Sequence, residues 1–98
     1  MEANLTLTSS DNLMDMAYDS GRSITVEIEE YVRNANRVGL KHGVRILSTD
    51  SEEDIETTGV LTGKVEFNSL SGIKGWIAEL DLELSDGDIL DILEEAGL

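Results

Sequence analysis

The strongest constraint on the fold is the alternation of apolar and polar residues near the end of the chain. Across residues 76–84, tryptophan, alanine or leucine occupies every second position, and the intervening positions hold Ile77, Glu79, Asp81 and Glu83. A period of two predicts a half-buried β-strand over this range. After Ser85 the apolar residues recur at intervals of three and four, which predicts an amphipathic helix through Ile89, Ile92, Leu93 and Ala96.

Five further segments have the periodicity of regular structure. Strands are predicted over residues 3–8, 44–48 and 60–68, a short helix over 13–17, and the main helix over 24–38. We expect Ser9 or Ser10 to cap the short helix and Ser23 to cap the main one. The start of the main helix also fits a strand, because Ile, Thr and Val favour that state, but Tyr31 and Ala35 continue only the helical period.

The order of these elements predicts an α+β fold: a mainly antiparallel sheet of about four strands, with two to three helices packed on one face. Residues 50–56 are expected to form an acidic loop or one helical turn. Residues 69–75 include two glycines and suit a hairpin connection between the last two strands. A chain of 98 residues suffices for one modest core, so residues 1–98 are expected to form a single domain.

The overall charge narrows the classes of partner. There are 21 Asp and Glu residues against 7 Lys and Arg, a formal net charge of −14. Such a chain repels nucleic acid and anionic membrane surfaces and favours a basic protein surface. The first residues lack the basic and apolar regions of a signal peptide, so a cytoplasmic protein is expected, in the host cell if a phage encodes it.

The acidic residues are concentrated in the second half of the chain. Residues 1–45 hold seven acids and five bases, whereas residues 46–98 hold fourteen acids and only Lys64 and Lys74. The predicted acidic face consists of Glu79, Asp81, Glu83, Asp88, Asp91, Glu94 and Glu95, extended by Asp50, Glu52, Glu53, Asp54 and Glu56. Alternate strand residues stand about 6.6–6.8 Å apart, but a DNA strand carries one phosphate per about 3.4 Å of axis. Strand, helix and acidic loop must therefore act together to imitate a duplex.

In size and charge pattern the chain resembles the acidic nucleic-acid-mimicking inhibitors of phages and mobile elements, such as anti-restriction and anti-CRISPR proteins. The resemblance covers the charge of residues 46–98 and transfers no functional residue. It implies a non-enzymatic inhibitor that binds a defence nuclease, a CRISPR complex or a repair enzyme through a DNA-mimicking face.

Two alternatives follow from the same charges. Arg33, Arg37 and Lys41 recur every four residues near the end of the main helix and are the candidate oligomer contacts of a small assembly or accessory protein, which docks or forms a homodimer through opposed acidic and basic poles. Cations near a helix C-terminus also simply complement its dipole. Adaptation to high salt is the other alternative, although the nearly neutral first half argues against it.

The residues of common catalytic and metal sites are scarce. There is no cysteine, and His42 is the only histidine, expected in a surface turn. A calcium loop starting at Asp81 fails, because Asp86 falls where glycine is required and Ile92 where a bidentate glutamate is required. Magnesium-dependent phosphoryl chemistry lacks arginines beside the carboxylates. We therefore expect no catalytic residues, no metal and no cofactor.

Overall fold

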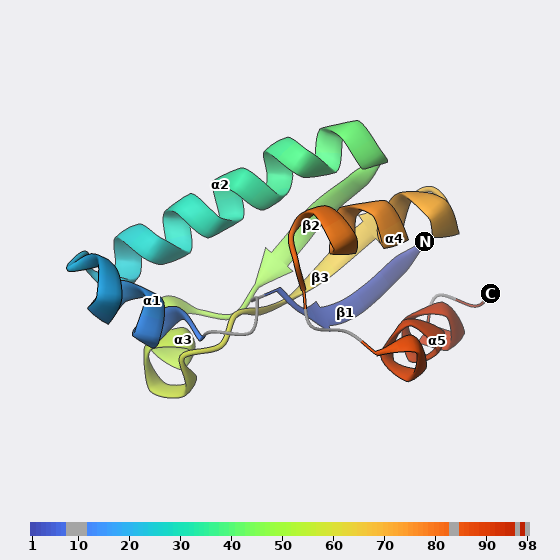
Figure 1. Ribbon diagram of the computed structural model, residues 1–98. Coiled ribbons are helices and arrows are strands. Elements are labelled where there is room, and N and C mark those ends of the chain that lie inside the picture. Colours follow the sequence, from blue (N-terminus) through green and yellow to red (C-terminus); the bar gives the residue numbers. More distant parts are fainter. Residues whose placement is uncertain (8–11, 83–84, 96, 98) are drawn as a thin grey trace.

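The computed structural model describes residues 1–7, 12–82, 85–95 and 97 (Figure 1). The elements in chain order are β1 (Glu2–Thr6), α1 (Leu13–Ser20), α2 (Ile24–His42), β2 (Val44–Thr49), α3 (Glu52–Thr58), β3 (Thr62–Phe67), α4 (Leu70–Glu79) and α5 (Asp86–Glu95). The three strands form an antiparallel sheet in the order β1-β3-β2. The α+β class and the antiparallel sheet are thus confirmed.

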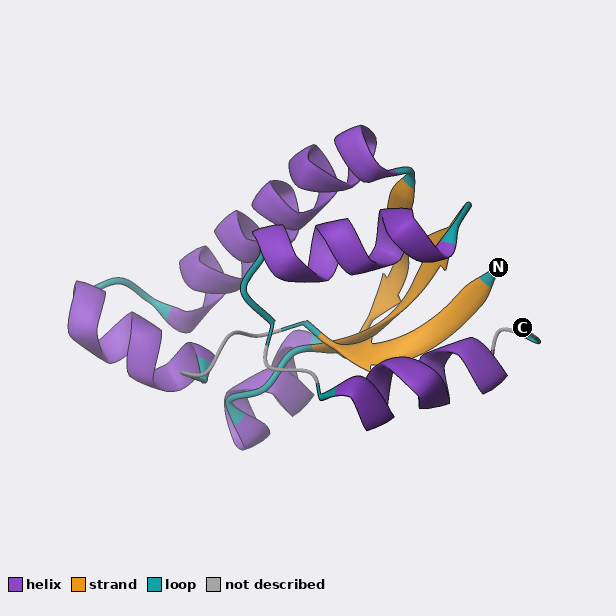
Figure 2. Ribbon diagram, turned by 45° about the vertical axis from the view of Figure 1, so that its right-hand side comes forward, coloured by secondary structure: helices purple, strands orange, loops and turns teal. Residues whose placement is uncertain are grey.

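The strand alternation sorts side chains onto two faces of the sheet. Val65 at the centre of β3 pairs with Ala3 of β1 and Ile46 of β2, and these residues face the apolar core. The neighbouring residue Lys64 pairs with Asn4 and lies on the polar face. In Figure 2, α2 and α4 cover the apolar face, while α5 packs along the outer edge of β1. The helices therefore do not all lie on one face, since α5 lies at an edge of the sheet.

Capping residues define the main helix. The Ser23 hydroxyl accepts a hydrogen bond from the amide of Val26, as predicted for an N-cap, and Gly43 ends α2 in the left-handed region. Asn12, and not a preceding serine, caps α1; Ser9 and Ser10 lie outside the described residues. The indole of Trp76 donates to the carbonyl of Ala35 at 2.9 Å, which joins α4 to α2 inside the core.

The prediction of a strand over residues 76–84 is wrong in its described part. Helix α4 continues to Glu79 and ends in a turn, with Asp81 at a φ of 55°; residues 83 and 84 lie outside the described part. The side chains of Ile73, Trp76, Ile77 and Leu80 are buried at helical intervals of three, four and seven. The alternating pattern also fits this period, and packing against α2 favours the helix.

The connection before α4 and the acidic segment before β3 also differ from, or refine, the predictions. Residues 69–75 begin α4, with Ser69 as its N-cap, so the expected hairpin connection is wrong. For the acidic residues 50–56, a loop or one helical turn was expected, and the helical alternative is the closer one, since most of these residues belong to the seven-residue helix α3, capped by Ser51. The described residues form three strands and five helices. No helix among them is long and apolar enough to cross a membrane.

Candidate functional site

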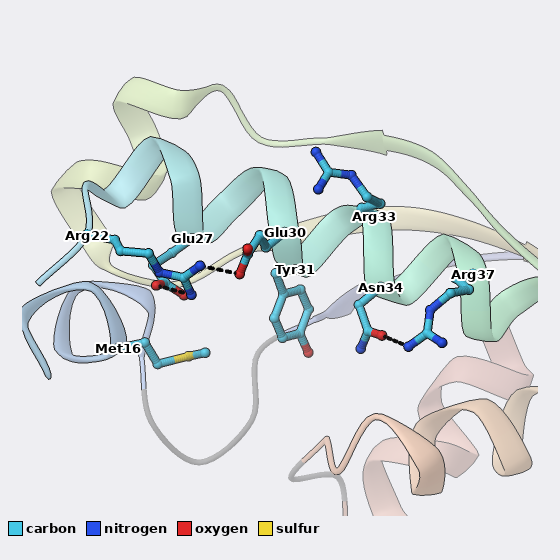
Figure 3. A pocket seen from close by; sticks show the side chains of 8 residues that line it. All are labelled: Met16, Arg22, Glu27, Glu30, Tyr31, Arg33, Asn34 and Arg37. Carbon is cyan, nitrogen blue, oxygen red and sulfur yellow. Dashed lines mark hydrogen bonds and ion pairs between the residues drawn. The ribbon is translucent and has the colours of Figure 1, made fainter. Parts of the chain in front are cut away.

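An open pocket of about 490 Å³ lies along one side of α2 (Figure 3). It is lined by Met16, Arg22, Glu27, Glu30, Tyr31, Arg33, Asn34 and Arg37. The residues come from α1, from the link that follows it, and from the first three turns of α2 and beyond. The side chain of Arg33 projects to the opposite side of α2 from Tyr31, so it contributes to the rim and not to the floor.

Glu27 is the one buried charged residue among those described, with 4% of its surface exposed. Its carboxylate accepts a hydrogen bond from the Ser20 hydroxyl at 2.8 Å and lies 2.7 Å from Nη2 of Arg22. Arg22 also contacts Glu30 at 2.6 Å, and the hydrogen bond with Glu30 raises the pKa of the guanidinium. A buried charge needs such partners. The cluster therefore fastens α1 to the start of α2.

Tyr31 and Asn34 form the rest of the pocket floor. The hydroxyl of Tyr31 is buried and has no hydrogen-bond partner in the described part of the chain, and burial raises the pKa of this phenol. Nη2 of Arg37 donates to the Asn34 side-chain oxygen at 2.6 Å. The pocket thus offers no activated nucleophile and no unpaired carboxylate at its base.

A second polar cluster joins the end of α2 to the end of α4. Nε2 of His42 lies 2.5 Å from Oε2 of Glu79, and Nζ of Lys41 lies 3.4 Å from Oε1 of the same carboxylate. The hydrogen bond from His42, reinforced by Lys41, lowers the pKa of Glu79. His42 is the last residue of α2, and its side chain is 20% exposed. Glu79 is thus engaged within the chain.

The structure divides the predicted acidic face. Glu79 belongs to α4, which covers the apolar face of the sheet, whereas α5 lies along the outer edge of β1 (Figure 2). Asp81 lies in the turn after α4, and Glu83 lies outside the described residues. The four residues that the structure does bring together are those of α5: Asp88, Asp91, Glu94 and Glu95. All four are exposed.

Two of the four α5 carboxylates have structural partners. Asp88 accepts hydrogen bonds from the amide and hydroxyl of Ser85, which caps the helix. Glu95 accepts from the backbone amide of Asn4 at 3.3 Å and from its side chain at 2.8 Å, and so covers the outer edge of β1. Asp91 and Glu94 have no such contact within the described residues, and they remain available to a partner.

Helix α3 carries a second group of exposed acids. They are Glu52, Glu53, Asp54 and Glu56. Glu52 accepts a hydrogen bond from Thr25, and Asp54 accepts one from Ser51. In both Figure 1 and Figure 2, α2 is drawn above the sheet, α5 lies low in the view beside β1, and α3 lies low in the view past the end of the sheet where β2 ends and β3 begins. The molecule therefore has an acidic side that α3 and α5 share.

The predicted basic residues fall into two groups. Arg33 and Arg37 are exposed on α2, and neither forms an ion pair with any residue that the structure describes. Lys41 contacts Glu79, as stated above, and Arg45 of β2 lies 3.3 Å from Glu66 of β3. The two unpaired arginines are notable in a chain with a threefold excess of acids.

The pairing of Glu27 with Arg22 was not predicted from the sequence. A signal was present, because Glu27 lies at the buried helical period set by Ile24, Ile28 and Tyr31. A buried acid in an apolar stripe requires a charged or hydrogen-bonding partner.

No family model, curated protein or solved structure matches the chain. Among the described residues, no three His, Asp or Glu side chains are grouped so that they hold a metal ion. The charges of the surface are therefore the features from which a function has to be inferred.

Proposed function

We propose that this protein is a non-enzymatic inhibitor that binds a basic surface of a nucleic-acid-handling enzyme through the acidic side formed by α3 and α5. The observation that supports the proposal is that α3 and α5 lie on one side of the molecule. Together these two helices expose eight acids, and neither contains a lysine or an arginine. A basic channel that binds phosphates accepts such a surface, because the same lysines and arginines pair with carboxylates.

The helical placement of these acids supports mimicry better than a strand does. Asp88, Asp91 and Glu94 are three residues apart, which corresponds to about 4.5 Å along a helix axis. A DNA strand carries one phosphate per about 3.4 Å of axis. The charge density of α5 thus approaches that of one DNA strand, and α3 adds a second row on the same side.

The test is an affinity capture from bacterial lysate with a matched pair of double variants. We expect the protein to retain a nuclease, helicase or CRISPR component that added duplex DNA or RNA displaces, and to inhibit its activity. Asp91→Asn with Glu94→Gln is expected to weaken binding about tenfold at 0.1 M salt, because an exposed ion pair contributes up to about 1 kcal/mol.

The control removes the same charge elsewhere. Asp15 and Asp19 are exposed on α1, and Asp15→Asn with Asp19→Asn leaves the acidic side intact. Equal losses in both double variants contradict a specific acidic surface. Partners that nucleic acid does not displace contradict mimicry.

A further inference from the structure

The two edges of the sheet differ in how they are covered. The outer edge of β1 is shielded by α5, and Glu95 accepts the hydrogen bond of the outward amide of Asn4. The outer edge of β2 has no neighbouring strand within the described chain, although α2 packs against its first residue, where a β-carbon on Gly39 would lie 2.2 Å from the Val44 carbonyl oxygen. An uncovered edge presents unpaired amides and carbonyls, and it is a template for pairing with another strand.

The hydrogen-bond pattern shows which β2 residues direct their backbone amides and carbonyls towards that edge. Gly43 accepts from the amide of Asn68, and Arg45 lies opposite Glu66, so both direct their backbone groups towards β3. Since alternate residues of a strand direct their backbone groups to opposite sides, Val44 and Ile46 direct theirs away from β3. The Val44 carbonyl lies against Gly39 of α2, so the part of the edge open to a partner begins at Ile46. The strand contains no proline or lysine. Its backbone is thus competent to accept a partner strand.

Exposed apolar surface flanks this edge. An open groove between α2 and β2 is lined by Asn36, Arg37, Leu40, Val44, Arg45 and Ile46. Leu40 is 88% exposed, although it occupies the third position from the end of a well-formed helix. Leu47, the extra residue of a β-bulge, is 37% exposed. Apolar residues gathered at an open strand edge indicate a contact surface.

Charge along this surface is polarised from one end to the other. Along α2, Glu29 is followed at helical intervals by Arg33 and Arg37 on the same exposed stripe as Leu40. Along β2, which runs in the opposite direction, Arg45 comes first and Asp50 follows the last residue. One end of the surface is therefore basic and the other end is acidic. Residues 31–49 contain no acid at all.

Arg45 and Asp50 also share one face of the sheet. Arg45 contacts Glu66, and the Asp50 carboxylate accepts a hydrogen bond from the Thr62 hydroxyl. Glu66 and Thr62 are four residues apart on β3, so their side chains point to the same side. An antiparallel copy of β2 that is centred between Leu47 and Ser48 places Arg45 of each copy opposite Asp50 of the other.

We infer that two copies of this chain associate about a two-fold axis through the surface formed by the exposed stripe of α2 and the edge of β2. The two β2 strands pair antiparallel, and the two α2 helices run antiparallel above them. The basic end of each surface then meets the acidic end of the other, which is the self-complementarity that an isologous interface requires. Helix α5 lies at the opposite edge of the sheet, along β1, and remains outside the contact, whereas α3 begins two residues after Asp50. The inference does not depend on the proposed function.

Sedimentation analysis of the purified chain tests the inference. We expect concentration-dependent dimers, twice the chain mass of 10.7 kDa, that weaken as NaCl is raised. Leu40→Glu is expected to raise the dimer dissociation constant at least tenfold. The matched control is Tyr18→Glu, because Tyr18 is equally exposed, at 88%, but lies on α1. Circular dichroism establishes that both variants are folded.

Amide exchange gives a second measurement that does not depend on a variant. The outward amide of Ile46 is expected to exchange more slowly as concentration rises, whereas the amide of Arg45, already directed at β3, is not. A chain that stays monomeric, a dimer that Leu40→Glu leaves intact, equal weakening by Tyr18→Glu, or an open-ended series of oligomers overturns the inference. Binding of an acidic strand from another protein to monomers also overturns it.

Discussion

At the crossing of α2 and β2, Gly39 leaves no space for a side chain. A β-carbon at this position would lie 2.2 Å from the carbonyl oxygen of Val44. Because the obstacle is backbone, relief requires that the helix and the strand move apart. The position therefore sets how closely α2 packs on the sheet. The indole nitrogen of Trp76 would lie 3.6 Å from the same β-carbon.

We expect Gly39→Ala to destabilise the fold by about 1–3 kcal/mol, the usual cost of overpacking. The control is Gly87→Ala at the exposed start of α5, where the nearest atom is the Ser85 hydroxyl oxygen at 3.6 Å. There, alanine is expected to stabilise the chain by up to about 1 kcal/mol, since it is the better helix former. Urea unfolding measures both changes. Similar effects at the two sites would refute the close approach.

At the level of elements, the contact between α2 and α4 is fastened at one end by a buried hydrogen bond and at the other by charge. The indole of Trp76 bonds to Ala35, and the Glu79 carboxylate bonds to His42 and Lys41. The first contact is shielded from water, whereas the second responds to pH. The end of α4 is the part of this contact that acid should loosen.

The lowered pKa of Glu79 sets the direction of that response. Its folded pKa lies below its unfolded one, so the contribution to stability is present at neutral pH and is lost as pH falls through the folded value. We expect the difference in melting temperature between the wild type and Glu79→Gln to be positive at pH 7 and to shrink towards pH 3. Thermal unfolding across this range measures it. A difference that is constant with pH would contradict an ionised pair.

On the scale of the whole molecule, the segregation of charge is the dominant feature. The first half has nearly balanced acids and bases, and the second half supplies the acids of α3 and α5. Repulsion within the acidic side opposes folding, and salt screens it. The core residues around Trp76 and Phe67 provide the opposing stabilisation.

We expect the chain to be folded in 0.01 M NaCl and to melt about 4–8 °C higher in 0.5 M NaCl, which corresponds to about 1 kcal/mol of relieved repulsion. Circular dichroism melts at micromolar concentration measure this shift. An unfolded chain at low salt would instead support the salt-adaptation alternative, since a halophilic protein requires salt in order to fold.

Much of the fold could be predicted from the sequence, because local signals determine local structure. The cap at Ser23, the helical period through Tyr31 and Ala35, and the alternation around Val65 each depend on residues a few positions apart. Those elements are present as predicted. The α+β class followed from their order.

Local signals did not determine the secondary structure of residues 76–79, because their pattern fits both a period of two and a helical period. Packing against Ala35, which lies 41 residues away, favours the helix. The partners of the candidate acidic residues likewise depend on distant parts of the chain. Composition shows how many acids the chain has, but only distant contacts determine that Glu79 and Glu95 are engaged while Asp91 and Glu94 have no partner among the described residues. Periodicity extends over one or two turns, whereas the partners of a carboxylate depend on how the whole chain folds.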